Sequence, residues 1–240
     1  MPNHVKNIVK MEGITKLPLF KTEYDEYEKR DVVCFDFNKI IPMPESLNVE
    51  SGSMETMAIE AVNRKLSQRR YGFQPAYSRP QMSDEDYQQR LKNCGKTEGE
   101  LLEMGLQYIT NKVRYGATSW YDWRCDNWGT KWNAYSNEQE GEDTIIFETA
   151  WSNPEPVMLK LSEMYPEETI EHWWADEDMG SNDGHRVYRG GEIVEGDYHD
   201  SCSNEAYETY MKCWGESQCL YQDEDGLWQR YDCDTCHRCD

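Results

Sequence analysis

Hydrophobic and polar residues alternate near the start of the chain in a way that predicts two β-strands. The apolar positions within His4–Met11 indicate the first strand. In Asp31–Ile41 every second side chain around Phe35 is apolar, which indicates a second strand that ends at Pro42. We expect the highly charged stretch Lys21–Arg30 between them to be a short helix or an exposed loop.

A helical period follows these strands. Met54–Leu66 contains neither Gly nor Pro and has its apolar residues near helical spacing. A second helix is predicted over Asp84–Cys94, with Ser83 as its N-cap. Thr97 and Glu100 form a capping pair that opens the clearest helix of the chain. We expect the apolar stripe of that helix to face the core: Leu102, Leu106, Ile109 and Val113.

The remainder of the chain alternates between strands and helices. The expected elements are a strand at Thr144–Trp151, a helix at Pro154–Tyr165, a strand at Thr169–Ala175, a hairpin of Arg186–Tyr188 and Glu192–Val194 across Gly190–Gly191, and a helix at Ser203–Trp214. His172 lies on the apolar face of its strand and is expected to be a core histidine. Strands and helices arranged around a helical insert are typical of an α+β fold.

The net charge narrows the classes of partner. The 240 residues include 25 Lys+Arg and 46 Asp+Glu, a formal charge of −21. Residues 163–240 hold 5 basic and 21 acidic residues, a net charge of −16, so the last third carries most of the excess. Direct binding to nucleic acid and adsorption to anionic membranes are both disfavoured. A basic partner, a cation or solubility alone remain as explanations.

The N-terminal segment and the cysteines bear on location. Met1–Met11 lacks the apolar stretch of a signal peptide, and no run approaches the length of a membrane span. We therefore expect a cytoplasmic protein. Its nine cysteines are then expected to be mostly reduced thiols or metal ligands.

Tryptophan is concentrated in the segment Tyr115–Tyr135. Rigid aromatic side chains with polar tips suit either a satisfied core or a contact surface, and core packing is the favoured interpretation. The residues proposed for a binding surface are Trp120, Trp123, Trp128 and Trp132 with the interleaved Asp122, Arg124 and Lys131.

Several stretches together resemble the YubB-like family of phage and conjugative-plasmid proteins. They are Met1–Asn7, Phe35–Pro44, Tyr115–Ala134, Phe147–Ser152 with Pro154 and Pro156, and the turn Asp176–Gly184. The most specific part is the run Trp128–Asn133, WGTKWN. The resemblance implies a ferredoxin-like antiparallel sheet over residues 1–200, with a helical insertion at about 51–115, in a protein of a mobile element. It implies no catalytic residues.

Residues 201–240, a helix and an acidic Cys-rich tail, lie outside this resemblance. Cysteine spacing there is compatible with a tetrahedral structural zinc site. The candidate ligands are Cys213, Cys219, Cys233, Cys236 and Cys239. Disulfides and free thiols are the alternatives for the same residues.

An acidic run at Asp176–Gly184 fails the template of a calcium-binding loop, because Gly180 and Val187 stand where oxygen ligands belong. We interpret the run as a turn between strands. Its acidic members are nevertheless candidates for a binding surface: Asp176, Glu177, Asp178 and Asp183.

Motifs for phosphate binding, for a serine nucleophile and for a zinc protease are absent from the sequence. The leading hypothesis is therefore a non-enzymatic binding protein that inhibits a host nuclease or defence complex through an acidic, DNA-mimicking surface. The partner would be a host protein with a basic surface. The alternative is an enzyme acting on a small molecule or nucleotide in a pocket lined by the four tryptophans. Binding of RNA on the sheet would need exposed aromatic residues beside Lys or Arg.

Overall fold

The computed structural model describes residues 3–26, 29–67 and 81–231. It divides the chain into two compact units. The first unit combines Met1–Pro42 with Asp126–Asp240, and the second is Met43–Cys125. The helical insertion is therefore a unit with its own contacts, whose boundaries lie somewhat outside the expected residues 51–115.

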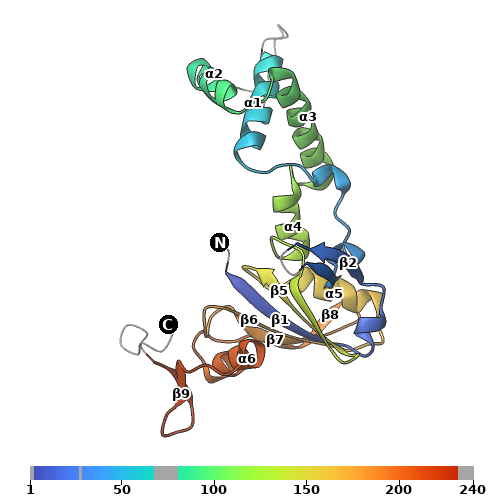
Figure 1. The fold of residues 1–240 in the computed structure, drawn as a ribbon, viewed down its shortest axis with the longest axis vertical. Coiled ribbons are helices and arrows are strands. Elements are labelled where there is room, and N and C mark those ends of the chain that lie inside the picture. The colour runs from blue at the N-terminus through green and yellow to red at the C-terminus, as the bar shows by residue number, and fades with distance from the viewer. Residues whose placement is uncertain (1–2, 27–28, 68–80, 232–240) are drawn as a thin grey trace. The chain divides into compact units, whose positions relative to one another are not determined.

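A six-stranded antiparallel sheet forms the body of the first unit (Figure 1). Its strands, in spatial order, are β4 (Tyr135–Glu140), β5 (Thr144–Ala150), β1 (His4–Lys10), β6 (Ile170–Asp176), β7 (Gly184–Arg189) and β8 (Glu192–Tyr198). β1 pairs with β5 on one side and with β6 on the other. The N-terminal strand thus lies inside the sheet, between two strands that follow it by more than a hundred residues.

Four of these strands have the connectivity of a ferredoxin-like domain. β5 and β6 flank β1 and are joined by helix α5 (Glu155–Met164), which is a split β-α-β unit. β4 and β5 form a hairpin at one edge of the sheet, and β7 and β8 extend the sheet beyond β6. The predicted ferredoxin-like α+β fold is therefore confirmed. The crossover from β1 to β4 carries the hairpin of β2 (Phe20–Asp25) and β3 (Arg30–Phe35) and the whole second unit.

The two faces of the sheet are covered by different helices. Helix α6 (Asn204–Trp214) packs against Ile8, Ile146 and Ala175 through Cys213. Glu155 of α5 pairs with Arg186, which belongs to the opposite face. Both faces are thus covered by a helix, which explains the nearly continuous burial along β5.

Aromatic rings fill the space between β5 and the crossover. Phe35, Phe37 and Phe147 have ring centroids between 5.3 and 5.9 Å apart. Trp128 lies 5.6 Å from Phe37, is fully buried, and donates its indole N–H to the Ile41 carbonyl at 2.9 Å. The polar tip of this tryptophan is therefore satisfied inside the core.

His172 is a core histidine, as its strand position predicts. Its Nε2 donates to Asn7 Oδ1 at 3.0 Å, and the Asn7 amide donates to Thr149 Oγ1 at 2.9 Å. Burial, with smaller contributions from Arg186 and His185, lowers the pKa of His172 to about 3. The imidazole is therefore neutral in the folded protein at any pH near neutrality.

Acid should destabilise the fold through this residue. An unfolded histidine has a pKa near 6.5, so between about pH 6.5 and pH 3 the unfolded chain binds a proton that the folded chain excludes. The free energy of unfolding should fall as the pH drops through that window. In urea titrations from pH 7 to pH 4, His172→Gln should show a flatter pH dependence than the parent protein. Parallel curves would contradict this account.

The second unit contains α1 (Ser53–Ser67), α2 (Asp84–Asn93), α3 (Glu98–Tyr115) and the first part of α4 (Trp120–Trp128). The three expected helices are present, and Thr97 and Glu100 form the full capping box. A cluster of buried side chains joins α1, α2 and α3: Met57, Ala58, Ala61, Tyr87, Leu101 and Tyr108.

The apolar stripe predicted for α3 was wrong. Leu106 is 57% exposed and Val113 is 82% exposed. The buried residues are instead Leu101, Gly105, Tyr108 and Asn111. The reason is close contact between α1 and α3, because Gly105 lies against the backbone of α1, where no larger residue fits.

Other local expectations also need correction. Within Lys21–Arg30, where a short helix or an exposed loop is expected, residues Lys21–Asp25 belong to β2 and Arg30 begins β3. The strand expected over Asp31–Ile41 ends at Phe35 and is followed by a 3-10 turn. Strand β4 was missed, because its outward residues are almost all polar. A small hairpin of β9 (Leu220–Gln222) and β10 (Trp228–Arg230) follows α6. Within the described ranges, no helix has the length and apolar character needed to cross a bilayer.

Replacing Gly105 tests the packing of α3. A Cβ at this position would lie 2.2 Å from the Ala58 carbonyl oxygen and 2.6 Å from Val62 Cγ2. Gly105→Ala should therefore lower the free energy of unfolding by about 1–3 kcal/mol. Gly99→Ala, in the same helix, meets nothing closer than 3.9 Å and should be neutral or stabilising. Equal effects of the two substitutions in thermal or urea unfolding would contradict the packing.

Candidate functional site

The backbone of Trp151 is the most unusual local feature of the first unit. This residue follows β5 directly and has φ 72°, in the left-handed region that a bulky side chain rarely adopts. Its N–H donates to the Asn3 carbonyl, and its carbonyl accepts from Asn182 Nδ2 at 2.8 Å. Although the backbone is fixed on both sides, the side chain is 44% exposed. Strained residues held by their surroundings concentrate at functional sites.

A second segment is tied to the same place through Thr130. The buried Thr130 hydroxyl donates to the Ala150 carbonyl at 2.8 Å and accepts from the Ala150 N–H at 3.1 Å. The Asn133 side chain fixes the other end of the segment, because it accepts from Phe37 N and donates to Asp36. The run 128–133 and the end of β5 therefore form one rigid surface.

Lys131 and Trp132 project from this scaffold toward Trp151. Lys131 Nζ lies 4.9 Å from the centroid of the Trp132 ring and 4.8 Å from that of Trp151. Both distances are within the range of a cation–π interaction. All three side chains keep contact with solvent. The fold thus places an ammonium group against two surface indoles.

Tyr135 and His4 continue the aromatic row. Tyr135 lies edge-on to Trp132 and to His4, at 6.0 and 5.7 Å between ring centroids. Its hydroxyl donates to the Thr149 carbonyl at 3.0 Å, so His4 Nδ1 donates to the Tyr135 oxygen at 2.8 Å. Burial, followed by the charges of Glu148 and Glu177, raises the pKa of Tyr135. The phenol therefore stays protonated.

The acidic turn contributes two kinds of carboxylate. Asp176 and Asp183 are buried. Asp176 accepts from Asn3, from Asn182 and from the Asp178 N–H, while Asp183 accepts from His199 at 3.0 Å. These two aspartates hold the turn, as the interpretation as a turn between strands predicts. Glu177 and Asp178 are exposed.

The other proposed binding residues are in different places. Trp120, Asp122, Trp123 and Arg124 belong to the second unit. Arg124 lies over the Trp120 ring at 5.0 Å, Asp122 is exposed, and Trp123 is buried. Trp128 is in the core of the first unit. Within the tryptophan segment Tyr115–Tyr135, the residues that the structure brings to the surface around Trp151 are therefore Lys131 and Trp132.

Two of the five proposed zinc ligands are described. Cys213 is buried in the apolar cluster under α6, where burial raises the pKa of its thiol to about 12. Cys219 is disulfide-bonded. Cys233, Cys236 and Cys239 lie outside the described residues. Among the residues that are described, no three His, Cys, Asp or Glu side chains converge as a metal site would require. The zinc site stays a prediction.

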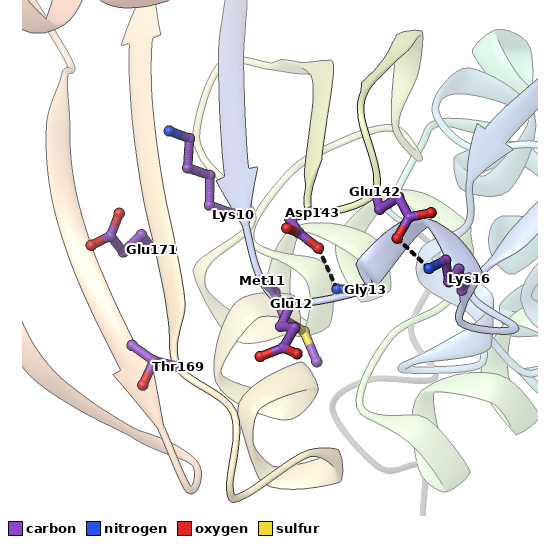
Figure 2. A pocket seen from close by; sticks show the side chains of 9 residues that line it. All are labelled: Lys10, Met11, Glu12, Gly13, Lys16, Glu142, Asp143, Thr169 and Glu171. Carbon is purple, nitrogen blue, oxygen red and sulfur yellow. Dashed lines mark hydrogen bonds and ion pairs between the residues drawn. The ribbon is translucent and has the colours of Figure 1, made fainter.

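A shallow hollow of about 550 Å³ lies at the other end of β1 (Figure 2). Several of its polar groups are engaged with one another, since Asp143 accepts from the Gly13 N–H at 2.7 Å and Lys16 pairs with Glu142. The Lys10 side chain points away from these pairs in Figure 2. The side chains do not converge on one point, so the hollow is a weaker candidate than the surface around Trp151.

Comparison with known proteins places the fold of this region. Residues 131–217 match the family described as the ferredoxin-like domain in Api92-like protein. This part of the chain is therefore similar to that domain, and its fold is ferredoxin-like. The match contains β4 to β8 with α5 and α6, and it leaves out β1, which completes the sheet.

No curated protein matches the chain. Among solved structures, the crystal structure of protein Api92 from Yersinia pseudotuberculosis is 10% identical and covers 83% of this chain and 99% of that one, with a TM-score of 0.36. Neither description names an enzyme, a phage or a plasmid, so the mobile-element origin stays a prediction.

Sequence reasoning missed Trp151, Tyr135 and His4 as members of the site. Trp151 was assigned to the end of a strand, where its side chain would count as packing. The signal available was that a tryptophan stands between a strand and the segment Ser152–Pro156, a position at which chains turn. Its left-handed backbone and its contact with Lys131 depend on segments distant in sequence.

Removing the Thr130 hydroxyl should loosen the site. Thr130→Val leaves the Ala150 N–H without its partner in a buried position. We expect a loss of about 1–3 kcal/mol in the free energy of unfolding, and changed NMR shifts for the Trp132 and Trp151 indoles. Thr15→Val, which removes a hydroxyl bonded to the Glu142 carbonyl near the surface, is the control and should cost less. Unchanged indole shifts in Thr130→Val would contradict this role.

Proposed function

We propose that this protein is a non-enzymatic binding protein of a mobile element that acts on a basic host protein in the bacterial cytoplasm. It would inhibit a host nuclease or defence complex by covering the basic surface on which that protein binds nucleic acid. The observation that carries the proposal is the concentration of exposed carboxylates on β8, on α6 and on the segments around them.

The carboxylates of this region lie mainly at the surface. The edge strand β8 is exposed along its whole length. The exposed acidic residues of β8, of α6 and of the segments around them are Glu177, Asp178, Glu192, Glu195, Asp197, Asp200, Glu205, Glu208 and Glu216. Such a density of surface charge steers a basic partner toward the protein and rejects acidic ones.

Nearby arginines pair with two of these nine carboxylates, Asp197 and Asp178. Arg186 is buried and pairs with Glu155 and Asp197. Arg230 lies 3.6 Å from Asp178, and Lys212 lies over the Trp173 ring. Hydrogen bonds from the Tyr198 N–H and Arg186 lower the pKa of Asp197, so this carboxylate stays ionised even at mildly acidic pH.

The binding interpretation is also supported by the buried polar side chains, which are already used in hydrogen bonds within the fold. The buried aspartates of the turn serve hydrogen bonds that fix the backbone. His172 is neutral and occupied by Asn7. The surface chemistry therefore favours recognition over a reaction.

The proposal predicts inhibition that depends on salt and on these carboxylates. When the protein is added to purified nucleases and defence complexes of a bacterial host, it should inhibit its target. Duplex DNA should compete with the protein for the same basic surface of that target. Inhibition should weaken as salt rises, because salt screens surface charge. The variant Glu192→Gln, Glu195→Gln, Glu208→Gln, Glu216→Gln should inhibit about ten-fold less at low salt.

A second variant removes the same charge elsewhere: Glu45→Gln, Glu103→Gln, Glu138→Gln, Glu140→Gln. These four residues are also exposed, but they lie before Glu177, the first of the nine carboxylates named above. This control should inhibit like the parent protein. Inhibition that ignores salt, or an equal loss in the two variants, would show that the proposed acidic surface is not the contact.

A further inference from the structure

We propose that Trp132 and Trp151 form a recognition site for a cationic side chain, arginine or lysine, of a partner protein, and that Lys131 occupies this site in the free protein. The inference rests on the proposed function, since it names one specific contact with a basic partner. The class of ligand is a guanidinium or ammonium group.

The contact of Lys131 with the two rings shows which chemistry the site accepts. Its Nζ lies within 5 Å of both ring centroids. Ring faces carry partial negative charge, and two of them around one cation are the arrangement by which proteins recognise ammonium groups. An internal lysine in this arrangement stands where the cation of a ligand would be.

The surrounding charges favour a cation over a phosphate. Glu148 and Glu177 are close enough to raise the pKa of Tyr135, the next ring in the row. Glu148 also lies 3.5 Å from His4. A nucleotide stacked between the indoles would bring its phosphate near these carboxylates and be repelled. A basic side chain would be attracted by the same groups.

The site is held in place before any ligand binds. Trp151 is fixed through its backbone by Asn3 and Asn182, and Lys131 and Trp132 are fixed through Thr130. Only the side chain of Lys131 has to move for a ligand to enter, and a lysine side chain has four rotatable bonds for that movement. Preorganised rings lose little entropy on binding.

The experiment is an NMR titration of the indole N–H signals in the full chain. The Trp132 and Trp151 signals are assigned with Trp132→Phe and Trp151→Phe. The probes are an octa-arginine peptide, N-acetylarginine amide and adenosine monophosphate. We expect the two signals to shift together with the arginine probes. Adenosine monophosphate should leave them unchanged.

Variants of Lys131 give the sharper readout. Lys131→Gln removes the internal competitor and should tighten binding of N-acetylarginine amide about three- to ten-fold. Lys131→Arg keeps a cation between the rings and should bind like the parent protein. Two results would contradict the cation site. One is unchanged binding of N-acetylarginine amide in Lys131→Gln. The other is that the parent protein binds adenosine monophosphate and Lys131→Gln binds it more weakly.

Loss of the rings completes the test. Trp151→Asn keeps a residue that tolerates the left-handed backbone and should abolish the response of the Trp132 signal to arginine. Trp120→Phe removes a tryptophan of the second unit whose ring contacts Arg124, and it is the matched control. The net charge is the same in both variants, so nonspecific attraction of the peptide cancels. Equal binding by the two variants would overturn the proposal.

Failure of the cation site and failure of the proposed function would give different results. Arginine binding at the two indoles without salt-dependent inhibition would overturn the acidic-surface function and leave the cation site standing. Inhibition that is intact in Trp151→Asn, together with no indole response to arginine, would overturn the cation site alone.

Discussion

The first unit depends on the position of β1 between β5 and β6. Seven residues of β1 pair with β5, and six pair with β6. Without β1, the two strands of the split β-α-β unit would be separated by the width of a missing strand, with unpaired backbone on both. The residues that match the ferredoxin-like family, 131–217, leave out β1 and all but the last few residues of the crossover. The sheet is therefore continuous only when the N-terminal strand is in place. In the chain, the helical insertion separates this strand from β4.

The same long-range pairing creates the surface around Trp151. The residue before β1, Asn3, holds the Trp151 N–H, and Asn182 of the turn after β6 holds its carbonyl. The run 128–133, which ends the crossover, is tied to the end of β5 by Thr130. Three connections therefore meet at one end of the sheet. A strained tryptophan is kept there by hydrogen bonds that also maintain the register of the central strands, so fold and candidate site share one set of interactions.

The spacing of apolar residues predicted most helices and strands. It failed in α3, where it could not decide which of two apolar rows is buried. The capping box at Thr97, the hairpin at Gly190–Gly191 and the core position of His172 follow from short-range chemistry, and the structure has all three. In α3, by contrast, two apolar rows run side by side, one through Leu101 and Tyr108 and one through Leu106 and Val113. Periodicity identifies both rows, but only the close approach of α1 at Gly105 decides which is buried.

The sequence by itself determined the α+β character, the helical insertion, the acidic last third and the run WGTKWN as a notable segment, because these depend on residues close together in the chain. Tertiary structure decided what that run does. It places Trp128 in the core, turns Thr130 and Asn133 into backbone clamps, and presents Lys131 and Trp132 to Trp151. Such a division of roles within six residues depends on partners 20 to 100 positions away, whose positions are fixed only when the sheet closes around β1.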